Sequence, residues 1–109
     1  MGEDARLFAD RGIELAFGTD LMAMRRPGVA VKLEFERLAA AGFTAQERLA
    51  IATLNAARFV GRGAELGQIE PGRIADLVIV AADPLENPAF LDRVDVVVKA
   101  GRVVYELGR

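Results

Sequence analysis

Asp20 is the side chain in this sequence with the clearest setting for chemistry. It follows residues 13–17, a short apolar segment that is predicted to be a buried strand, and only Gly18 and Thr19 intervene. In parallel α/β proteins, catalytic side chains lie just past the C-terminal ends of the strands. Asp20 is therefore a candidate catalytic residue. The simpler interpretation is that its carboxylate caps a turn or the next helix.

The alternation of side chains along a strand also assigns Asp20 to one face. The bulky residues share one face: Ile13, Leu15 and Phe17. The small and acidic residues share the other: Glu14, Ala16, Gly18 and Asp20. We therefore expect the bulky face to pack against other elements, while the opposite face narrows toward the Asp20 carboxylate.

The loop after Asp20 offers weaker candidates. Met22 and Arg25 could line a substrate pocket, before the turn marked by Pro27 and Gly28. The alternative is that Arg25 and Arg26 form an exposed basic pair that faces water.

Composition limits the classes of partner and of chemistry. The 109 residues suffice for one small domain, and the formal net charge is −2. No basic cluster is longer than Arg25-Arg26, so nucleic acid is not an expected partner. No apolar run reaches about 18 residues, so no membrane span is predicted. Cysteine is absent, which excludes disulfides and thiol catalysis and fits a cytoplasmic protein.

Histidine is absent as well. The chain alone therefore lacks the residues for Ser-His-Asp or Cys-His catalysis. It also lacks the commonest protein ligand of zinc. Any metal site built from this chain alone would consist of carboxylates.

Local signals predict three helices in the first part of the chain. Residues 3–11 form the first, which ends at Gly12, and residues 30–41 form the second, with apolar residues on one face. The third begins at Thr44 and runs to about residue 59. Thr44 and Glu47 have the spacing of a capping box, which is typically worth ~1 kcal/mol.

The second part of the chain is predicted to be mainly strands. Pro71 and Gly72 suit a type II turn, and the apolar residues 75–80 indicate a strand buried on both faces. Asn87 and Pro88 are expected to open a short helical turn. Residues 94–99 and 102–105 then form a β-hairpin.

Five short segments occur in a characteristic order. They are residues 16–20 (AFGTD), 52–58 (ATLNAAR), 66–79 (LGQIEPGRIADLVI), 83–85 (DPL) and 96–104 (VVVKAGRVV). Together they resemble the C-terminal quarter of the amidohydrolase superfamily, and most of all its imidazolonepropionase-like and prolidase-like members.

The resemblance implies an α/β fold made from the C-terminal part of a metal-dependent hydrolase. Residues 1–62 would be the end of its (β/α)8 barrel, with residues 13–17 as the last strand and the following helices. Residues 63–109 would be the C-terminal strands of a small composite β-sandwich.

The resemblance also implies an activity. The parent enzyme would be a metal-dependent hydrolase of C–N bonds in small-molecule amides, cyclic amides or dipeptides. Asp20 matches the family's aspartate at the end of the eighth strand, which is both a metal ligand and the base that activates the metal-bound water. The implied cofactor is a divalent metal, zinc.

Most of the implied machinery is missing from these residues. A complete barrel needs roughly 250 residues, and the family's other metal ligands, which include histidines, have no counterpart here. We therefore expect a fragment that is inactive alone and binds no metal tightly. The alternative is a non-catalytic folded module that forms homodimers through exposed strand edges.

Overall fold

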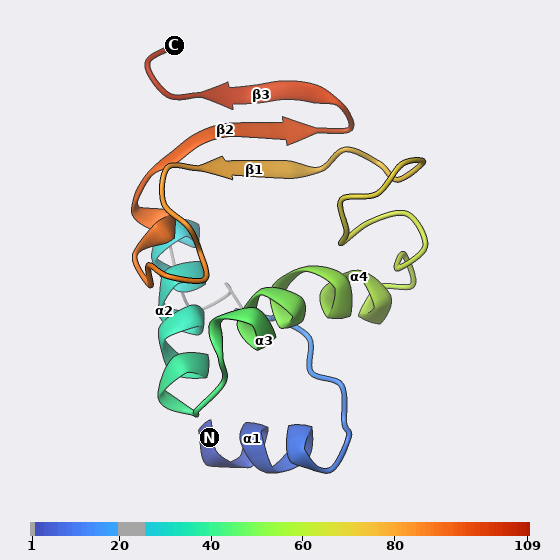
Figure 1. Cartoon of the computed structure of the whole chain (residues 1–109), viewed down its shortest axis with the longest axis vertical. Coiled ribbons are helices and arrows are strands. Elements are labelled where there is room, and N and C mark those ends of the chain that lie inside the picture. Colours follow the sequence, from blue (N-terminus) through green and yellow to red (C-terminus); the bar gives the residue numbers. More distant parts are fainter. Residues whose placement is uncertain (1, 20–25) are drawn as a thin grey trace.

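The computed structural model describes residues 2–19 and 26–109. Its helices gather at one end of the molecule, and a three-stranded sheet forms the other end (Figure 1). Strand β1, Leu77–Val80, is the strand nearest to the helices. In the part of the chain that is described, no helix has the length and apolar character needed to cross a membrane.

The predicted helices are confirmed with shifted bounds. Helix α1 spans Gly2–Asp10, and α2 spans Pro27–Ala40. Helix α2 begins three residues earlier than expected because Pro27 occupies its first turn, where the fixed φ of proline suits a helix. Helix α3, Ala45–Ala50, continues through a π-helical turn, η2 (Ile51–Asn55), into α4, Ala56–Phe59.

The capping box that begins α3 is confirmed. The Thr44 hydroxyl accepts a hydrogen bond from the Glu47 amide at 3.2 Å, and the Glu47 carboxylate accepts one from the Thr44 amide at 2.8 Å. Two backbone donors that would otherwise lack partners at the helix start are thereby satisfied.

A small apolar core lies between the helices. Its buried members are Leu38, Phe43 and Ile51. The partly buried residues packed against it include Leu15 and Phe17. The bulky face predicted for residues 13–17 therefore packs against the helices at Leu15 and Phe17, whereas Ile13 is exposed.

The strand predicted at residues 13–17 is wrong for this structure, in which residues 13–19 form no regular strand. The Ile13 amide donates to the Phe8 carbonyl at 3.0 Å, and the Phe17 amide donates to the Ile51 carbonyl at 3.1 Å. A strand exists only through pairing with a neighbouring strand. Within residues 2–19 and 26–109, the sheet contains only the three strands of the second half.

The sheet confirms the predicted hairpin. Strands β2, Val94–Lys99, and β3, Arg102–Glu106, pair antiparallel, and β1 pairs antiparallel with the other edge of β2. The short 3₁₀ turn η3, Phe90–Asp92, leads into β2. Ala100 and Gly101 both have positive φ, 49° and 78°, as a type I′ hairpin turn requires.

Burial of β1 on both faces is also wrong. The Val78 and Ile79 side chains in its centre are 56% and 50% exposed. No described element covers the sheet at these positions.

Candidate functional site

Three predicted site residues cannot be placed. Asp20, Met22 and Arg25 lie outside the described residues. The site is therefore built from residues 13–19, which lead to Asp20, and from the elements that hold them.

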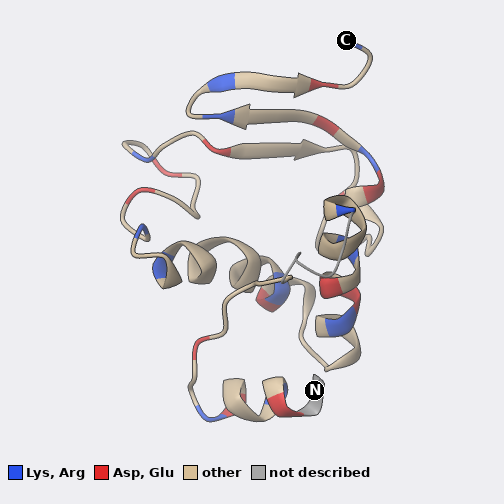
Figure 2. Ribbon diagram, turned by 180° about the vertical axis from the view of Figure 1, so that it is seen from behind, with Lys and Arg blue, Asp and Glu red and all other residues tan. Residues whose placement is uncertain are grey.

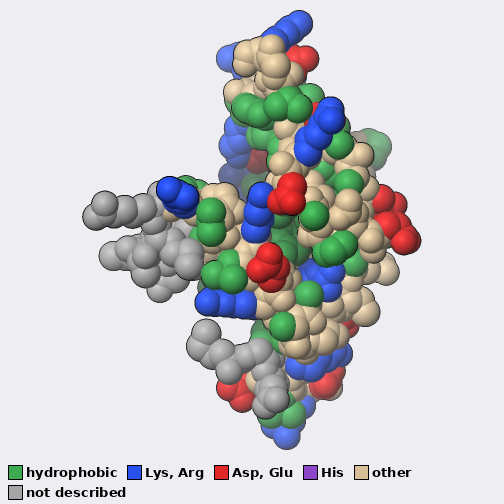
Figure 3. Space-filling view, turned by 90° about the vertical axis from the view of Figure 1, so that its left-hand side faces the viewer, with side chains coloured by type: hydrophobic (Ala, Val, Ile, Leu, Met, Phe, Trp, Pro, Cys, Tyr) green, Lys and Arg blue, Asp and Glu red, His purple; other side chains and the backbone are tan. Residues whose placement is uncertain are grey.

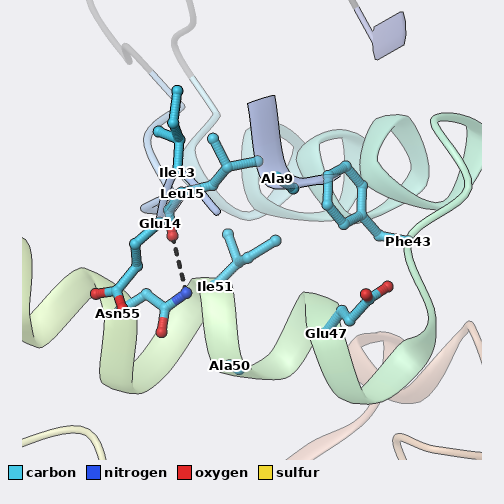
Figure 4. Close-up of a pocket in the computed structure, with 9 residues that line it drawn as sticks. All are labelled: Ala9, Ile13, Glu14, Leu15, Phe43, Glu47, Ala50, Ile51 and Asn55. Carbon is cyan, nitrogen blue, oxygen red and sulfur yellow. Dashed lines mark hydrogen bonds between the residues drawn. The ribbon is translucent and has the colours of Figure 1, made fainter. Parts of the chain in front are cut away.

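Helix η2 fixes the segment that leads to Asp20. The Asn55 side-chain amide donates to the Leu15 carbonyl at 3.1 Å (Figure 4), and the Ile51 carbonyl accepts the Phe17 amide at 3.1 Å. In a π-helical turn the regular i→i−4 ladder is interrupted. The Ile51 carbonyl at the start of this turn and the Asn55 side chain at its end both bond to the extended segment.

The alternation predicted for the segment holds for Leu15 and Phe17 but not for Ile13, whose side chain is 52% exposed. Leu15 and Phe17 pack against the core, and the Phe17 ring lies 5.3 Å from the Phe35 ring between centroids. Gly18 is exposed. Two of the three bulky side chains that precede Asp20, Leu15 and Phe17, therefore pack against the helices.

A shallow cavity of about 160 Å³ lies between α1, the segment and α3 (Figure 4). It is lined by Ala9, Ile13, Glu14, Leu15, Phe43, Glu47, Ala50, Ile51 and Asn55. Two carboxylates, Glu14 and Glu47, are its only acidic groups among these lining residues.

Both carboxylates have arginine partners. Arg6 Nη1 lies 3.1 Å from Glu47 Oε2, and Arg58 Nη1 lies 3.1 Å from Glu14 Oε2. The hydrogen bond from the Thr44 amide, followed by that from Arg6, lowers the pKa of Glu47. Hydrogen bonds from Arg6 to Asp10 and to Glu47 raise the pKa of Arg6. Since Glu47 is held ionised and belongs to the capping box, its role here is structural.

The described donors do not fit a metal centre. No group of three or more His, Cys, Asp or Glu side chains lies close enough together within residues 2–19 and 26–109 to hold a metal ion. The whole chain has no histidine and no cysteine. A catalytic metal site needs about three protein ligands and an open position, so these residues cannot provide one unaided.

Sequence reasoning missed Asp76 as an individual residue. Its carboxylate accepts hydrogen bonds from the Lys99 ammonium and, at 2.8 Å, from the Ala100 amide. The bond from Lys99, followed by that from Ala100, lowers the pKa of Asp76. These hydrogen bonds of Asp76 therefore connect the start of β1 to the hairpin turn between β2 and β3. The sequence signal that could have identified Asp76 is a carboxylate directly before an apolar strand.

Arg73 and Gly67 were likewise missed as individual residues of the loop before β1. Arg73 Nη1 donates to the Gly63 carbonyl at 2.6 Å and to the Leu66 carbonyl at 3.2 Å. Gly67 has φ +90°, and a Cβ there would lie 2.7 Å from Leu54 Cα. The loop is thus held against the alanine-rich helix by a close approach that only glycine permits.

The sequence pattern of the Amidohydrolase family matches residues 3–104. The chain is 36% identical over 110 residues to the imidazolonepropionase of Geobacillus sp. (strain WCH70), a match that covers 97% of this chain and 26% of the relative. The imidazolonepropionase of Shouchella clausii (strain KSM-K16) is also 36% identical, over 96% of this chain and 24% of the relative. The chain therefore spans about a quarter of the length of these curated relatives.

Solved structures match the fold over a similar share of their own length. A Xaa-Pro dipeptidase with bound methionine in the active site aligns with a TM-score of 0.84 and 33% identity, over 96% of this chain and 25% of the other. A structure from Bifidobacterium longum aligns with a TM-score of 0.86 and 36% identity, over 95% and 26% respectively. The arrangement of helices and sheet described here is thus similar to one region of much larger proteins.

Proposed function

Because this chain belongs to the amidohydrolase family, we propose that it supplies the Asp20-bearing end of the active site of a hydrolase that cleaves carbon–nitrogen bonds. The observation that carries the proposal is the anchoring of residues 13–17. Leu15 and Phe17 pack against the helices, and the Asn55 and Ile51 hydrogen bonds fix the backbone between them. This is the support that a carboxylate at the end of such a segment requires for a fixed position.

In this proposal Asp20 is one ligand of a divalent metal, zinc, and the base of the reaction. A carboxylate suits proton transfer to and from reacting groups. The described donors do not fit a complete metal site, so the remaining ligands would come from outside these 109 residues. The chain alone is not expected to bind the metal tightly.

The two halves of the chain have separate proposed roles. Residues 1–62 would complete the barrel that holds the reaction site, and residues 63–109 would be part of a β-sandwich beside it. The substrate would be a small-molecule amide, a cyclic amide or a dipeptide, since the relatives include imidazolonepropionases and a Xaa-Pro dipeptidase. Met22 and Arg25 are the proposed substrate contacts from this chain.

A chimera tests the proposal. Residues 3–104 would replace the matching quarter of the imidazolonepropionase of Geobacillus sp. (strain WCH70), and turnover of that relative's own substrate would be measured with zinc present. We expect turnover from the chimera and none from the 109-residue chain with zinc. A folded, zinc-loaded chimera without turnover would contradict the proposed role of this chain. Turnover by the 109 residues alone would contradict the need for outside ligands.

The exposed sheet favours a second candidate function, self-association. Exposed apolar side chains occupy both outer strands, β1 and β3: Val78, Ile79, Val103, Val104 and Tyr105. Figure 3 shows hydrophobic side chains exposed at the end of the molecule that carries the sheet. Exposed strand edges with apolar side chains favour pairing with another chain.

The sequence of β3 suits pairing with a second copy. In an antiparallel pair of β3 strands centred on Val104, Arg102 would face Glu106 of the second copy, and Val103 would face Tyr105. Sedimentation velocity of the purified chain over a range of concentrations tests this candidate. A concentration-dependent dimer is expected, and a monomer at every concentration would contradict it.

A further inference from the structure

Three phenylalanines connect the two halves of the chain. The Phe17 and Phe35 rings lie 5.3 Å apart between centroids, tilted by 44°. The Phe35 and Phe90 rings lie 5.4 Å apart in an edge-to-face arrangement, with 90° between their planes. Phe17 precedes Asp20 by three residues, whereas Phe90 belongs to η3 in the sheet half. The rings therefore join η3, α2 and the segment that leads to Asp20.

Local hydrogen bonds shape the segment that contains η3 and place Phe90 toward the interior. The Asn87 side chain accepts from the Ala89 amide at 2.8 Å, and the Asn87 carbonyl accepts from the Phe90 amide at 3.2 Å. Phe90 is buried, at 9% exposure, although its neighbours at 88, 89 and 92 are exposed. The turn predicted from Asn87 and Pro88 thus places the Phe90 ring against α2.

An ion pair lies beside the contact between Phe90 and α2. Lys32 Nζ lies 2.6 Å from Asp92 Oδ1, and Lys32 is one helical turn from Phe35 on α2. The two views of the ribbon show the segment with η3 lying against α2 (Figures 1 and 2). An aromatic anchor therefore joins the sheet half to the helix that supports Phe17, with an exposed ion pair beside it.

We propose that Phe90 is a positioning residue for the segment that leads to Asp20, acting through Phe35 and Phe17. The inference rests on the proposed role of Asp20. With Phe90 in place, Phe35 is confined between two rings and Phe17 is held against it. The backbone at Phe17 then keeps its bond to the Ile51 carbonyl, three residues before the carboxylate. In this account the sheet half is needed to hold Phe17 and its backbone bond to Ile51 in place.

The test is carried out on the 109-residue chain by NMR. Hydrogen exchange of the Phe17 amide would be compared with that of the Val60 amide, which bonds to the Ala56 carbonyl in the helix that contains α4. Replacing Phe90 by leucine removes the ring but keeps an apolar side chain. We expect Phe90→Leu to reduce protection at Phe17 roughly two- to tenfold more than at Val60, and to shift the Asp20 amide resonance.

Further variants separate positioning from general stability. Phe90→Tyr keeps the ring and should retain both signals. In a Phe35→Leu background, Phe90→Leu should no longer affect Phe17, because the middle ring is gone. If Phe90→Leu does not fold, Phe90→Met fills more of the space and gives the same readout.

Equal loss of protection at Phe17 and Val60, or an Asp20 resonance that does not move, would overturn the proposal. Since no turnover is measured, failure here is distinguishable from failure of the catalytic role of Asp20.

Discussion

The Asn55 side chain is hydrogen-bonded to the Leu15 carbonyl at 3.1 Å across 40 positions of sequence. This bond joins the end of the π-helical turn η2 to the middle of the segment that leads to Asp20. It is partly buried, so water does not readily replace either partner. The position of the segment therefore depends on a residue of the third helix.

Replacing Asn55 by alanine should loosen residues 13–17. The Leu15 carbonyl would lose its partner in a partly buried place, and the free energy of unfolding should fall by about 1 kcal/mol. Urea denaturation measures this loss. Thr53→Ala is the matched control, since its exposed hydroxyl donates to the Leu49 carbonyl of its own helix. Equal effects of the two substitutions would contradict the account.

Gly67 should tolerate alanine less well than Gly72. Both have positive φ, +90° and +86°, so alanine at either costs ~1–2 kcal/mol. At Gly67 the added Cβ would also meet Leu54 Cα at 2.7 Å, whereas at Gly72 it would meet nothing within 4 Å. Thermal unfolding should show the larger loss for Gly67→Ala. Similar losses would mean that the loop does not pack closely on the helix.

Asp76 should contribute to stability at neutral pH and lose that contribution in acid. Its pKa is lowered in the folded chain from an ordinary value of 3.8, so its stabilisation is present above that value. The stabilisation is lost as pH falls through the lower, folded pKa. The urea midpoint of unfolding should fall between pH 6 and a pH below 4. This fall should be smaller for Asp76→Asn than for the original chain. Glu86 is an exposed acid in the same half, so Glu86→Gln should leave the fall in the urea midpoint as large as in the original chain.

Arg102 and Glu106 should control the proposed pairing of β3 strands. Arg102→Glu would place like charges opposite each other in the dimer and weaken it, and Glu106→Arg would do the same. The double swap should restore dimerisation, because opposite charges face each other again. Sedimentation equilibrium of the three variants measures this. A double swap that stays monomeric while the original chain dimerises would contradict the proposed register.

Local elements were predictable because their signals are local. Thr44 and Glu47 identified a helix start, and Ala100-Gly101 between valine-rich runs identified a hairpin. The start of α2 was placed late because Pro27 was assigned to a turn with Gly28, although proline serves equally well in the first turn of a helix.

Features that depend on distant residues were not predictable. The apolar residues 13–17 show a preference for burial, but they do not specify whether a strand neighbour is present. The same holds for Val78 and Ile79, which are exposed because nothing described covers them. The bond between Asn55 and Leu15 has no sequence signal. The role of Asp20 stays a prediction from its place after an apolar segment and from the resemblance, and the roles of Met22 and Arg25 stay predictions from the composition of the loop that follows it.

The central claim is that Asp20 is the catalytic carboxylate of this chain. Its most direct test is kcat of the chimera with Asp20→Asn, measured beside Asp4→Asn, an exposed acid of α1. Loss of a general base typically costs about 10²–10⁴ in rate, so Asp20→Asn should lower kcat by roughly that factor while Asp4→Asn leaves it unchanged. An Asp20→Asn chimera that turns over as fast as the Asp4→Asn chimera would contradict the claim.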